Sequence, residues 1–171
     1  MPAARKAPKK AARHTAAEPS PLAAEAFADL LKLDLQLCFA VYSTALAFNG
    51  VYKRLLDPLG LTYPQYLVML VLWERDGVSV KEIGRLLHLD SGTLTPLLKR
   101  LEAAGLLQRS RDRADERQLQ VTLTAQGRTL RERAQTVPLG IGSACGLQAG
   151  ELLALRDQLL ALRQRLDTAA E

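Results

Sequence analysis

The sequence predicts a mainly α-helical fold with a small β-hairpin, and three features of its 171 residues carry this prediction. Apolar side chains recur at helical spacing along most of the chain after Phe27. Between Leu106 and Leu123, two short runs of strand-like composition flank a highly charged segment, RDRADER. Long apolar or amphipathic segments stand on both sides of this region, at Phe27 to about Leu56 and at Gln148 to Asp167. We therefore expect a central module of short helices and one hairpin, flanked by two terminal helices.

The composition suits one globular domain with loose ends, because 48% of the residues are apolar and 24% are charged. The net charge of +5 does not by itself indicate a nucleic-acid partner, since +3 of it falls on residues 1–28. The local charge is more informative. Between Ser91 and Arg113 there are five basic residues and two acidic ones.

Several classes of protein are disfavoured by the sequence. No apolar run approaches the roughly 18 residues of a membrane span, and the N-terminus lacks the apolar core of a signal peptide. We therefore expect a cytoplasmic protein with no membrane partner. In a reducing compartment, Cys38 and Cys145 are not expected to form a permanent disulfide. The His, Cys and carboxylate residues show no metal-ligand spacing, so neither a metal nor another cofactor is predicted.

Residues 1 to about 24 are rich in Ala, Lys and Pro and have almost no large apolar side chains. Such a segment cannot bury enough surface to offset the entropy of ordering, so we expect a disordered basic tail. The tail either adds weak, salt-sensitive affinity for phosphates or serves only to keep the protein in solution.

The first helix, predicted from Phe27 to about Leu56, is apolar nearly all round and ends at Asp57-Pro58. A helix of this kind must be covered on several sides, which indicates a subunit interface. The next helix opens with the capping box Thr62 to Gln65, has its buried face from Leu67 to Trp73, and is expected to end at Gly77.

A short helix and a longer one follow, separated by the turn His88-Leu89-Asp90. Ser79 and Glu82 form a second capping box at the start of the short helix. Gly105 is placed to end the longer helix, whose predicted buried face consists of Leu94, Leu97, Leu98 and Leu101. Its start is open: either Asp90 or Ser91 is the N-cap and Pro96 lies inside the helix, or Thr95 is the cap and Pro96 is the first helical residue.

After this helix, Leu106 to Arg111 can form a strand, and Leu119, Val121 and Leu123 alternate with polar residues as in a half-buried strand. Two helices with a short turn and a charged hairpin make a winged helix-turn-helix, whose natural partner is double-stranded DNA. The candidate DNA contacts are the hydroxyls at the N-terminal end of the second helix, the cations along it, and the hairpin tip, where Asp115 would hold one of the two arginines. They are Ser91, Thr93, Thr95, Lys99, Arg100, Arg113, Asp115 and Arg117.

Another helix is predicted from Thr124 to roughly Thr136, with Pro138, Gly140 and Gly142 breaking or kinking it before Cys145. The final helix, Gln148 to Asp167, repeats leucine at helical spacing and finds no partner within the winged module. We expect it to pack with the first helix and its symmetry mate in a dimerisation layer.

This arrangement resembles the MarR family of transcription regulators, and Asp115-Glu116-Arg117 looks like the family's D-x-R wing motif. The resemblance implies one domain over residues 25–171, with dimerisation helices at 25–60 and 124–171 and the winged helix-turn-helix at 61–123. A closer resemblance rests on Leu37-Cys38-Phe39, Tyr42, the Tyr52 region, and the stretches LTYPQYLVMLVLWE and LDSGTLTPLLKRLE. These look like the organic-hydroperoxide-sensing repressors of the OhrR type.

In that subfamily a cysteine of the first helix senses peroxide, and by position it corresponds to Cys38. Two tyrosines of the partner subunit bond to its sulfur and correspond to Tyr52 and Tyr63, while Tyr42 lies on the cysteine's own helix. A second cysteine found in some members, which forms an intersubunit disulfide with the oxidised sensor, corresponds to Cys145.

The resemblance therefore implies a homodimeric repressor that binds a pseudo-palindromic operator and releases it when an organic hydroperoxide oxidises Cys38. One alternative keeps the DNA binding but replaces oxidation by a reversible phenolic ligand. A third possibility, a thiol peroxidase using Cys38, leaves the winged helix unexplained.

Overall fold

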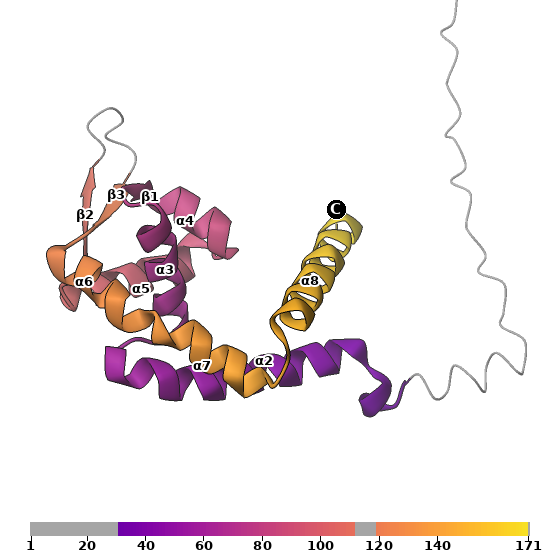
Figure 1. The fold of residues 1–171 in the computed structure, drawn as a ribbon. Coiled ribbons are helices and arrows are strands. Elements are labelled where there is room, and N and C mark those ends of the chain that lie inside the picture. The colour runs from indigo at the N-terminus through magenta and orange to yellow at the C-terminus, as the bar shows by residue number, and fades with distance from the viewer. Residues whose placement is uncertain (1–30, 112–118, 171) are drawn as a thin grey trace, which may run out of the picture. The chain divides into compact units, whose positions relative to one another are not determined.

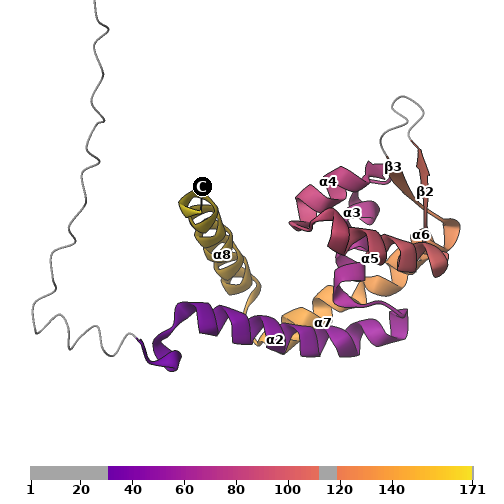
Figure 2. The same ribbon diagram turned by 180° about the vertical axis from the view of Figure 1, so that it is seen from behind.

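The computed structural model describes residues 31–111 and 119–170 (Figures 1 and 2). It confirms a mainly α-helical fold with a small antiparallel sheet. The tail predicted over residues 1–24 and the wing-tip residues Arg113, Asp115 and Arg117 lie outside the described residues.

The chain divides between Thr44 and Ala45, within the helix α2 (Leu37–Leu56), into two compact units. The elements are η2 (Leu33–Leu35), α2 (Leu37–Leu56), η3 (Asp57–Leu59), α3 (Tyr63–Glu74), β1 (Val78–Ser79), α4 (Val80–Leu87), α5 (Ser91–Ala103), β2 (Leu107–Arg111), β3 (Leu119–Leu123), α6 (Ala125–Ala134), α7 (Thr136–Cys145) and α8 (Ala149–Ala169).

The predicted hairpin is formed by β2 and β3, which pair antiparallel from Leu107 opposite Leu123 to Arg111 opposite Leu119. A third strand, β1, pairs with β3 on its other side and was not predicted, because two residues are too few to show a pattern. Val121 and Leu123 point into the core as expected. Leu119 remains 39% exposed at the outer end of the wing.

The core of the second unit lies between the helix-turn-helix, the sheet and α3, which packs against α4, α5, α6 and β3. It is built from aliphatic side chains, and the sequence pattern had placed several of them inward, among them Leu94, Leu98, Leu101 and Val121. Those less than 2% exposed include Leu56, Met69, Leu72, Ile83, Leu94, Leu98, Leu101, Leu107 and Val121. The helix-turn-helix with its hairpin is thus a continuously packed body, which fixes α5 on its surface.

The predicted start of the first helix, at Phe27, does not agree with the structure, in which α2 begins at Leu37. Gln36 has extended backbone angles (φ −81°, ψ 112°), and the residues before it form the single 3-10 turn η2. An apolar pattern shows which residues can be covered by protein, but it does not mark where helical hydrogen bonding begins.

The capping box predicted at the next helix is confirmed, since Gln65 Oε1 accepts a hydrogen bond from Thr62 N at 2.8 Å. The helix α3 ends at Glu74, before the predicted end at Gly77. Gly77 has a positive φ of 71° and turns the chain into β1.

The predicted break around Pro138 is also wrong, since this proline and Gly140 and Gly142 all lie inside α7. Helix α6 instead ends at Ala134, and α7 starts anew at Thr136. Pro138 is then in the first turn of a helix, where a missing amide hydrogen costs nothing. Gly140 allows close packing of α7 along the C-terminal part of α2 (Figures 1 and 2), since a Cβ there would lie 2.8 Å from Leu55 Cδ2.

Asp76 joins three segments of the second unit. Its Oδ1 accepts hydrogen bonds from Gly77 N at 2.9 Å and from Leu123 N at 2.8 Å. Its Oδ2 pairs with the guanidinium of Arg128 on α6, also at 2.8 Å. The loop after α3, the strand β3 and the helix α6 are therefore held by one carboxylate.

No single helix in the described part of the chain is long and apolar enough to span a membrane. Helices α2 with η3 and α3 reach that length and composition only as a pair bent by 66°.

Gly127 on α6 offers a test of the packing. A Cβ at this position would overlap the carbonyl oxygen of Leu106, and the Gly127 carbonyl itself accepts a hydrogen bond from Trp73 Nε1. We expect Gly127→Ala to lower the free energy of unfolding by about 2 kcal/mol, measured by urea unfolding at one fixed protein concentration.

Gly150→Ala is the matched control, because a Cβ at Gly150 meets nothing within 4 Å. It should be neutral or raise the stability by up to about 1 kcal/mol, owing to the better helix propensity of alanine. Equal stability of the two variants would contradict the close approach of α6 to Leu106.

Candidate functional site

The start of α5 is set by Asp90, which settles the choice that the sequence left open. Asp90 Oδ1 accepts a hydrogen bond from Thr93 N at 2.9 Å, and Oδ2 accepts one from Thr93 Oγ1 at 2.8 Å. The helix therefore begins at Ser91, and Pro96 lies inside it. The backbone hydrogen bond from Thr93 is the main reason why the pKa of Asp90 is lowered.

The exposed side of α5 carries the predicted DNA contacts. Leu94, Leu98 and Leu101 are buried on one face. On the other sides Ser91, Thr93, Lys99 and Arg100 are exposed and Thr95 is half-buried. Gly92 and Pro96 are exposed as well and share a face with Lys99 at helical spacing. The sequence analysis did not include these two among the candidate DNA contacts because neither has a polar side chain.

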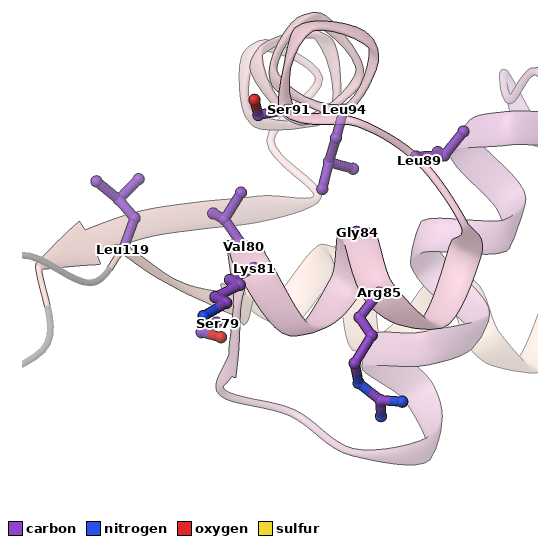
Figure 3. A pocket seen from close by; sticks show the side chains of 9 residues that line it. All are labelled: Ser79, Val80, Lys81, Gly84, Arg85, Leu89, Ser91, Leu94 and Leu119. Atoms are coloured by element: carbon purple, nitrogen blue, oxygen red, sulfur yellow. The ribbon is translucent and has the colours of Figure 1, made fainter. Parts of the chain in front are cut away.

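A hollow of about 440 Å³ lies between α4, the first turn of α5 and the start of β3 (Figure 3). Leu94 of α5 and Val80 of α4 point toward each other in it, whereas Arg85 points away from α5. The N-terminal turns of two helices border this hollow through Ser79 and Ser91, and Lys81 adds a cation. Helix N-termini and a cation favour a phosphate group, so this edge of the module suits a DNA backbone.

Only half of the capping box predicted at α4 forms. Ser79 Oγ accepts a hydrogen bond from Glu82 N at 3.2 Å, but the Glu82 carboxylate does not reach back. It pairs with Arg85 at 2.7 Å and with Arg75 at 3.5 Å. The stronger charge-assisted contact with a guanidinium takes the place of the second capping bond. His88 turns the chain after α4 with a positive φ of 53°, as a turn residue should, and its ring contacts Arg163 of α8 at 2.7 Å.

The base of the wing is attached to α5 by a contact that the sequence did not reveal. Glu102 Oε2 pairs with Arg109 Nη2 at 2.6 Å and with Nε at 3.0 Å, while its Oε1 accepts from the backbone N of Arg109 at 3.0 Å. The side-chain hydrogen bonds of Arg109 are the main reason why the pKa of Glu102 is lowered. Because one residue is on α5 and the other on β2, the pair fixes where the wing starts relative to the recognition helix.

Cys38 lies exposed in the first turn of α2, with Gln36 Oε1 at 4.0 Å from its sulfur. Its apolar neighbours are exposed too: Leu37 by 63%, Phe39 by 37% and Tyr42 by 60%. The rings of Phe39 and Tyr42 lie 6.4 Å apart on this surface. The thiol is therefore accessible in the single chain, surrounded by apolar side chains.

Two other predicted residues, Tyr52 and Tyr63, lie side by side in the second unit, and the predicted Cys145 lies near Tyr52. The rings of Tyr52 and Tyr63 are 4.2 Å apart, and Tyr66 continues the cluster 6.1 Å from Tyr52. Burial, followed by the proximity of Tyr63, Tyr66 and Cys145, raises the pKa of Tyr52 to about 12. Burial also raises the pKa of Tyr66, which sequence reasoning did not single out. Phenols with raised pKa values keep their protons at neutral pH and can donate hydrogen bonds to an anion.

No group of three or more His, Cys, Asp or Glu side chains that could hold a metal ion occurs in the described part of the chain. The candidate groups are the thiols of Cys38 and Cys145, the phenols of Tyr52 and Tyr63, and the exposed side of α5.

A packed helix-turn-helix with a hairpin wing defines a winged-helix DNA-binding protein. A family model described as "Transcriptional regulator SarA/Rot" matches residues 50–133. The HTH-type transcriptional regulator TtmR of Methylorubrum extorquens (strain PA1) is 54% identical over 83% of this chain and 73% of its own length. The organic hydroperoxide resistance transcriptional regulator of Bacillus subtilis (strain 168) is 46% identical over 81% of this chain and 94% of its own length.

Among solved structures, reduced AbfR bound to DNA is 39% identical and covers 84% of this chain and 98% of its own, with a TM-score of 0.71. AbfR, from Staphylococcus epidermidis, was also solved in a disulfide-formed state, which is 38% identical over 81% of this chain and 98% of its own with a TM-score of 0.58. The chain belongs to the SarA/Rot and MarR family of winged-helix transcriptional regulators. It is a DNA-binding transcriptional regulator and not an enzyme.

The contact between Glu102 and Arg109 makes a prediction about pH. We expect Glu102→Gln to lower the free energy of unfolding by about 1 kcal/mol at neutral pH, a modest value because the pair is partly exposed. The folded-state pKa of Glu102 is below its ordinary value of 4.5, so its contribution is complete above that pH and is lost as the pH falls through the lower value. Urea unfolding of both proteins at decreasing pH should show the difference vanish.

Glu132→Gln, at an exposed position of α6, is the control and should leave the stability nearly unchanged at neutral pH. A difference between wild type and Glu102→Gln that persists at acid pH would show that the carboxylate charge is not its cause.

Proposed function

We propose that the protein is a homodimeric repressor that binds a pseudo-palindromic operator while Cys38 is reduced and releases it when an organic hydroperoxide oxidises Cys38. The observation that carries this proposal is the contact between two phenols, Tyr52 and Tyr63, whose rings lie 4.2 Å apart, with Cys145 near Tyr52. The similarity to the Bacillus subtilis hydroperoxide regulator and to AbfR, solved both reduced on DNA and with a disulfide, supports it.

The exposed apolar surfaces of the terminal helices support the dimer. On α2 they include Leu37, Val41 and Leu46, and on α8 Leu155 and Leu159, all at least 44% exposed. An apolar surface of this extent is typical of a protein interface. The dimer places two copies of α5 on one DNA duplex, where they must lie about 34 Å apart to enter successive major grooves.

On the DNA side, Ser91, Thr93 and Thr95 would face the bases, and Lys99 and Arg100 the groove or the phosphates. Ser79 and Lys81 at the hollow described above are further candidates for phosphate contacts. The wing-tip arginines, Arg113 and Arg117, stay predictions, one of them for the minor groove and one held by Asp115.

The sensing step begins at the thiolate of Cys38, which attacks the outer oxygen of the peroxide. The O–O bond breaks, an alcohol leaves after taking up a proton, and the sulfur becomes a sulfenic acid. The thiol of Cys145 from the partner then attacks this sulfur, a disulfide forms and water leaves. Tyr52 and Tyr63 of the partner, with Tyr42 from the same helix, would donate hydrogen bonds to the thiolate and so lower the pKa of Cys38.

Oxidation reaches the DNA through the helices that carry these groups. Tyr52 lies on α2 and Tyr63 begins α3, which packs directly against α4 and α5. Any movement of the phenols toward or away from the sulfur therefore changes the placement of α5. A small rotation of each subunit of the dimer is sufficient to change the distance between the two α5 helices, so that they no longer fit the operator.

Cys38→Ser tests the sensor. The variant should bind operator DNA like the reduced wild type and remain bound when cumene hydroperoxide is added, because serine cannot form a sulfenic acid. A gel-shift titration with and without peroxide measures this. Normal release of the variant by peroxide would remove Cys38 from the mechanism, and release by a phenolic acid in the presence of reductant would favour a reversible ligand instead.

Cys145→Ser is the companion variant. After peroxide treatment the wild type should run as a covalent dimer on a non-reducing gel, and this variant should not. A covalent dimer that persists in Cys145→Ser would contradict the assignment of Cys145 as resolving thiol.

Tyr52→Phe tests the phenols. It removes one hydrogen-bond donor from the thiolate of Cys38, so peroxide should react with the sulfur about tenfold more slowly at neutral pH, the change that a thiol pKa higher by about one would give. The loss of free thiol after rapid mixing with peroxide measures the rate. Tyr66→Phe, in the same cluster, should leave the rate unchanged, and an equal effect of both variants would indicate a structural role for the cluster only.

A further inference from the structure

The hydroxyl protons of two residues expected to read bases are already used within the protein. Thr93 Oγ1 donates to Asp90 Oδ2 at 2.8 Å, and Thr95 Oγ1 donates to the carbonyl oxygen of Ser91 at 2.7 Å. A hydroxyl has one proton, so neither can donate to a base edge without giving up a bond that stabilises the start of α5. What remains of each side chain for an outside partner is its methyl group and the lone pairs of the oxygen.

The neighbouring surface offers few hydrogen-bond donors. Gly92 has no side chain, and Pro96 presents only a saturated ring; both are exposed in the first two turns of α5. Ser91 is exposed and has no hydrogen-bond partner for its hydroxyl among the described residues. Lys99 is the next cation, one turn beyond Thr95. The first two turns of α5 therefore offer few free side-chain donors beyond the hydroxyl of Ser91, and they expose apolar surface at Pro96.

In the major groove, the only apolar group on a base edge is the 5-methyl group of thymine. We propose that α5 recognises its operator through thymine methyl groups, with the methyl of Thr95 and the ring of Pro96 as the contacting surfaces. This inference rests on the proposed function, because it requires that α5 binds specific duplex DNA. It replaces the expectation that threonine hydroxyls read the bases as donors.

The DNA side of the test uses duplexes recovered by the reduced wild-type protein from a random-sequence pool. Each thymine of a recovered duplex is replaced in turn by deoxyuridine, which removes one methyl group and leaves base pairing and groove donors and acceptors unchanged. At the thymines that α5 contacts, the affinity should fall about fourfold, the effect expected for one buried methyl group.

Two protein variants test the methyl group and the hydroxyl group of Thr95 separately. Thr95→Val keeps a methyl and removes the hydroxyl, whereas Thr95→Ser keeps the hydroxyl and removes the methyl. We expect Thr95→Val to keep the affinity and its sensitivity to deoxyuridine. Thr95→Ser removes one methyl from each subunit of the dimer, so it should bind about fifteenfold more weakly and be indifferent to deoxyuridine at one thymine of each half-site.

Thr129→Ser is the matched control. Thr129 of α6 also donates its hydroxyl to the carbonyl four residues earlier, at 3.1 Å, but lies outside α5. It should leave DNA binding unchanged, and thermal unfolding followed by circular dichroism should show all three variants folded.

The outcomes separate the two proposals. If the reduced wild type enriches no sequence, the proposed operator binding fails and this inference fails with it. If it enriches a sequence but tolerates deoxyuridine at every thymine, only the inference that α5 recognises thymine methyl groups is overturned. The same inference is overturned if Thr95→Ser binds well and Thr95→Val does not. The last of these results would indicate that the hydroxyl of Thr95, and not its methyl group, contacts the base.

Discussion

The hydrogen bonds between Asp90 and Thr93 determine where α5 begins and therefore which of its side chains are exposed. They fix Ser91 as the first residue of α5, and helical geometry then decides which side chains are covered and which face outward. Had Thr95 been the cap, the helix would have begun at Pro96, and the four residues before Thr95 would have formed a loop. The cap also occupies the hydroxyl of Thr93, so the interaction that starts the helix changes what its first turn can offer to a base. The shape and the chemistry of the recognition surface thus depend on the same carboxylate.

The buried tyrosines show a similar link between packing and chemistry. Tyr52 and Tyr66 help to build the contact between α2 and α3, and burial raises the pKa of both phenols. A phenol keeps its proton near neutral pH, so its hydroxyl can donate a hydrogen bond to a thiolate. Since Tyr52 also lies near Cys145, movement of that cysteine toward another sulfur would change the surroundings of Tyr52 first. The cluster therefore connects the proposed redox step to α3, against which the recognition helix packs.

The sequence predicted the elements whose signals are local. The box from Thr62 to Gln65, the leucine spacing of α5 and the alternation at Val121 and Leu123 each reflect residues within one turn or one strand. Features that depend on distant partners were missed: β1 exists only because β3 lies beside it, and the Glu102–Arg109 and Asp76–Arg128 pairs join separate elements. The helix break predicted at Pro138 was wrong, because the effect of a proline depends on where the helix starts, and Pro138 lies in the first turn of α7. The candidate sensing residues Tyr52, Tyr63 and Cys145 were assigned by resemblance, since no spacing rule joins them, and their roles stay predictions.

Recognition by methyl contacts would suit a regulator that releases DNA after a small movement. Dispersion falls steeply with distance, so a gap of about 0.5–1 Å already forfeits a quarter to a half of each contact. Attraction between lysine or arginine and phosphates declines much more slowly, because it is Coulombic and is limited mainly by a screening length of about 8–10 Å. A small change in the separation of the two α5 helices would thus remove the sequence-dependent part of binding before the sequence-independent part. On this argument the oxidised protein does not need to leave DNA altogether: it loses its preference for the operator and is then competed away by the excess of other sites.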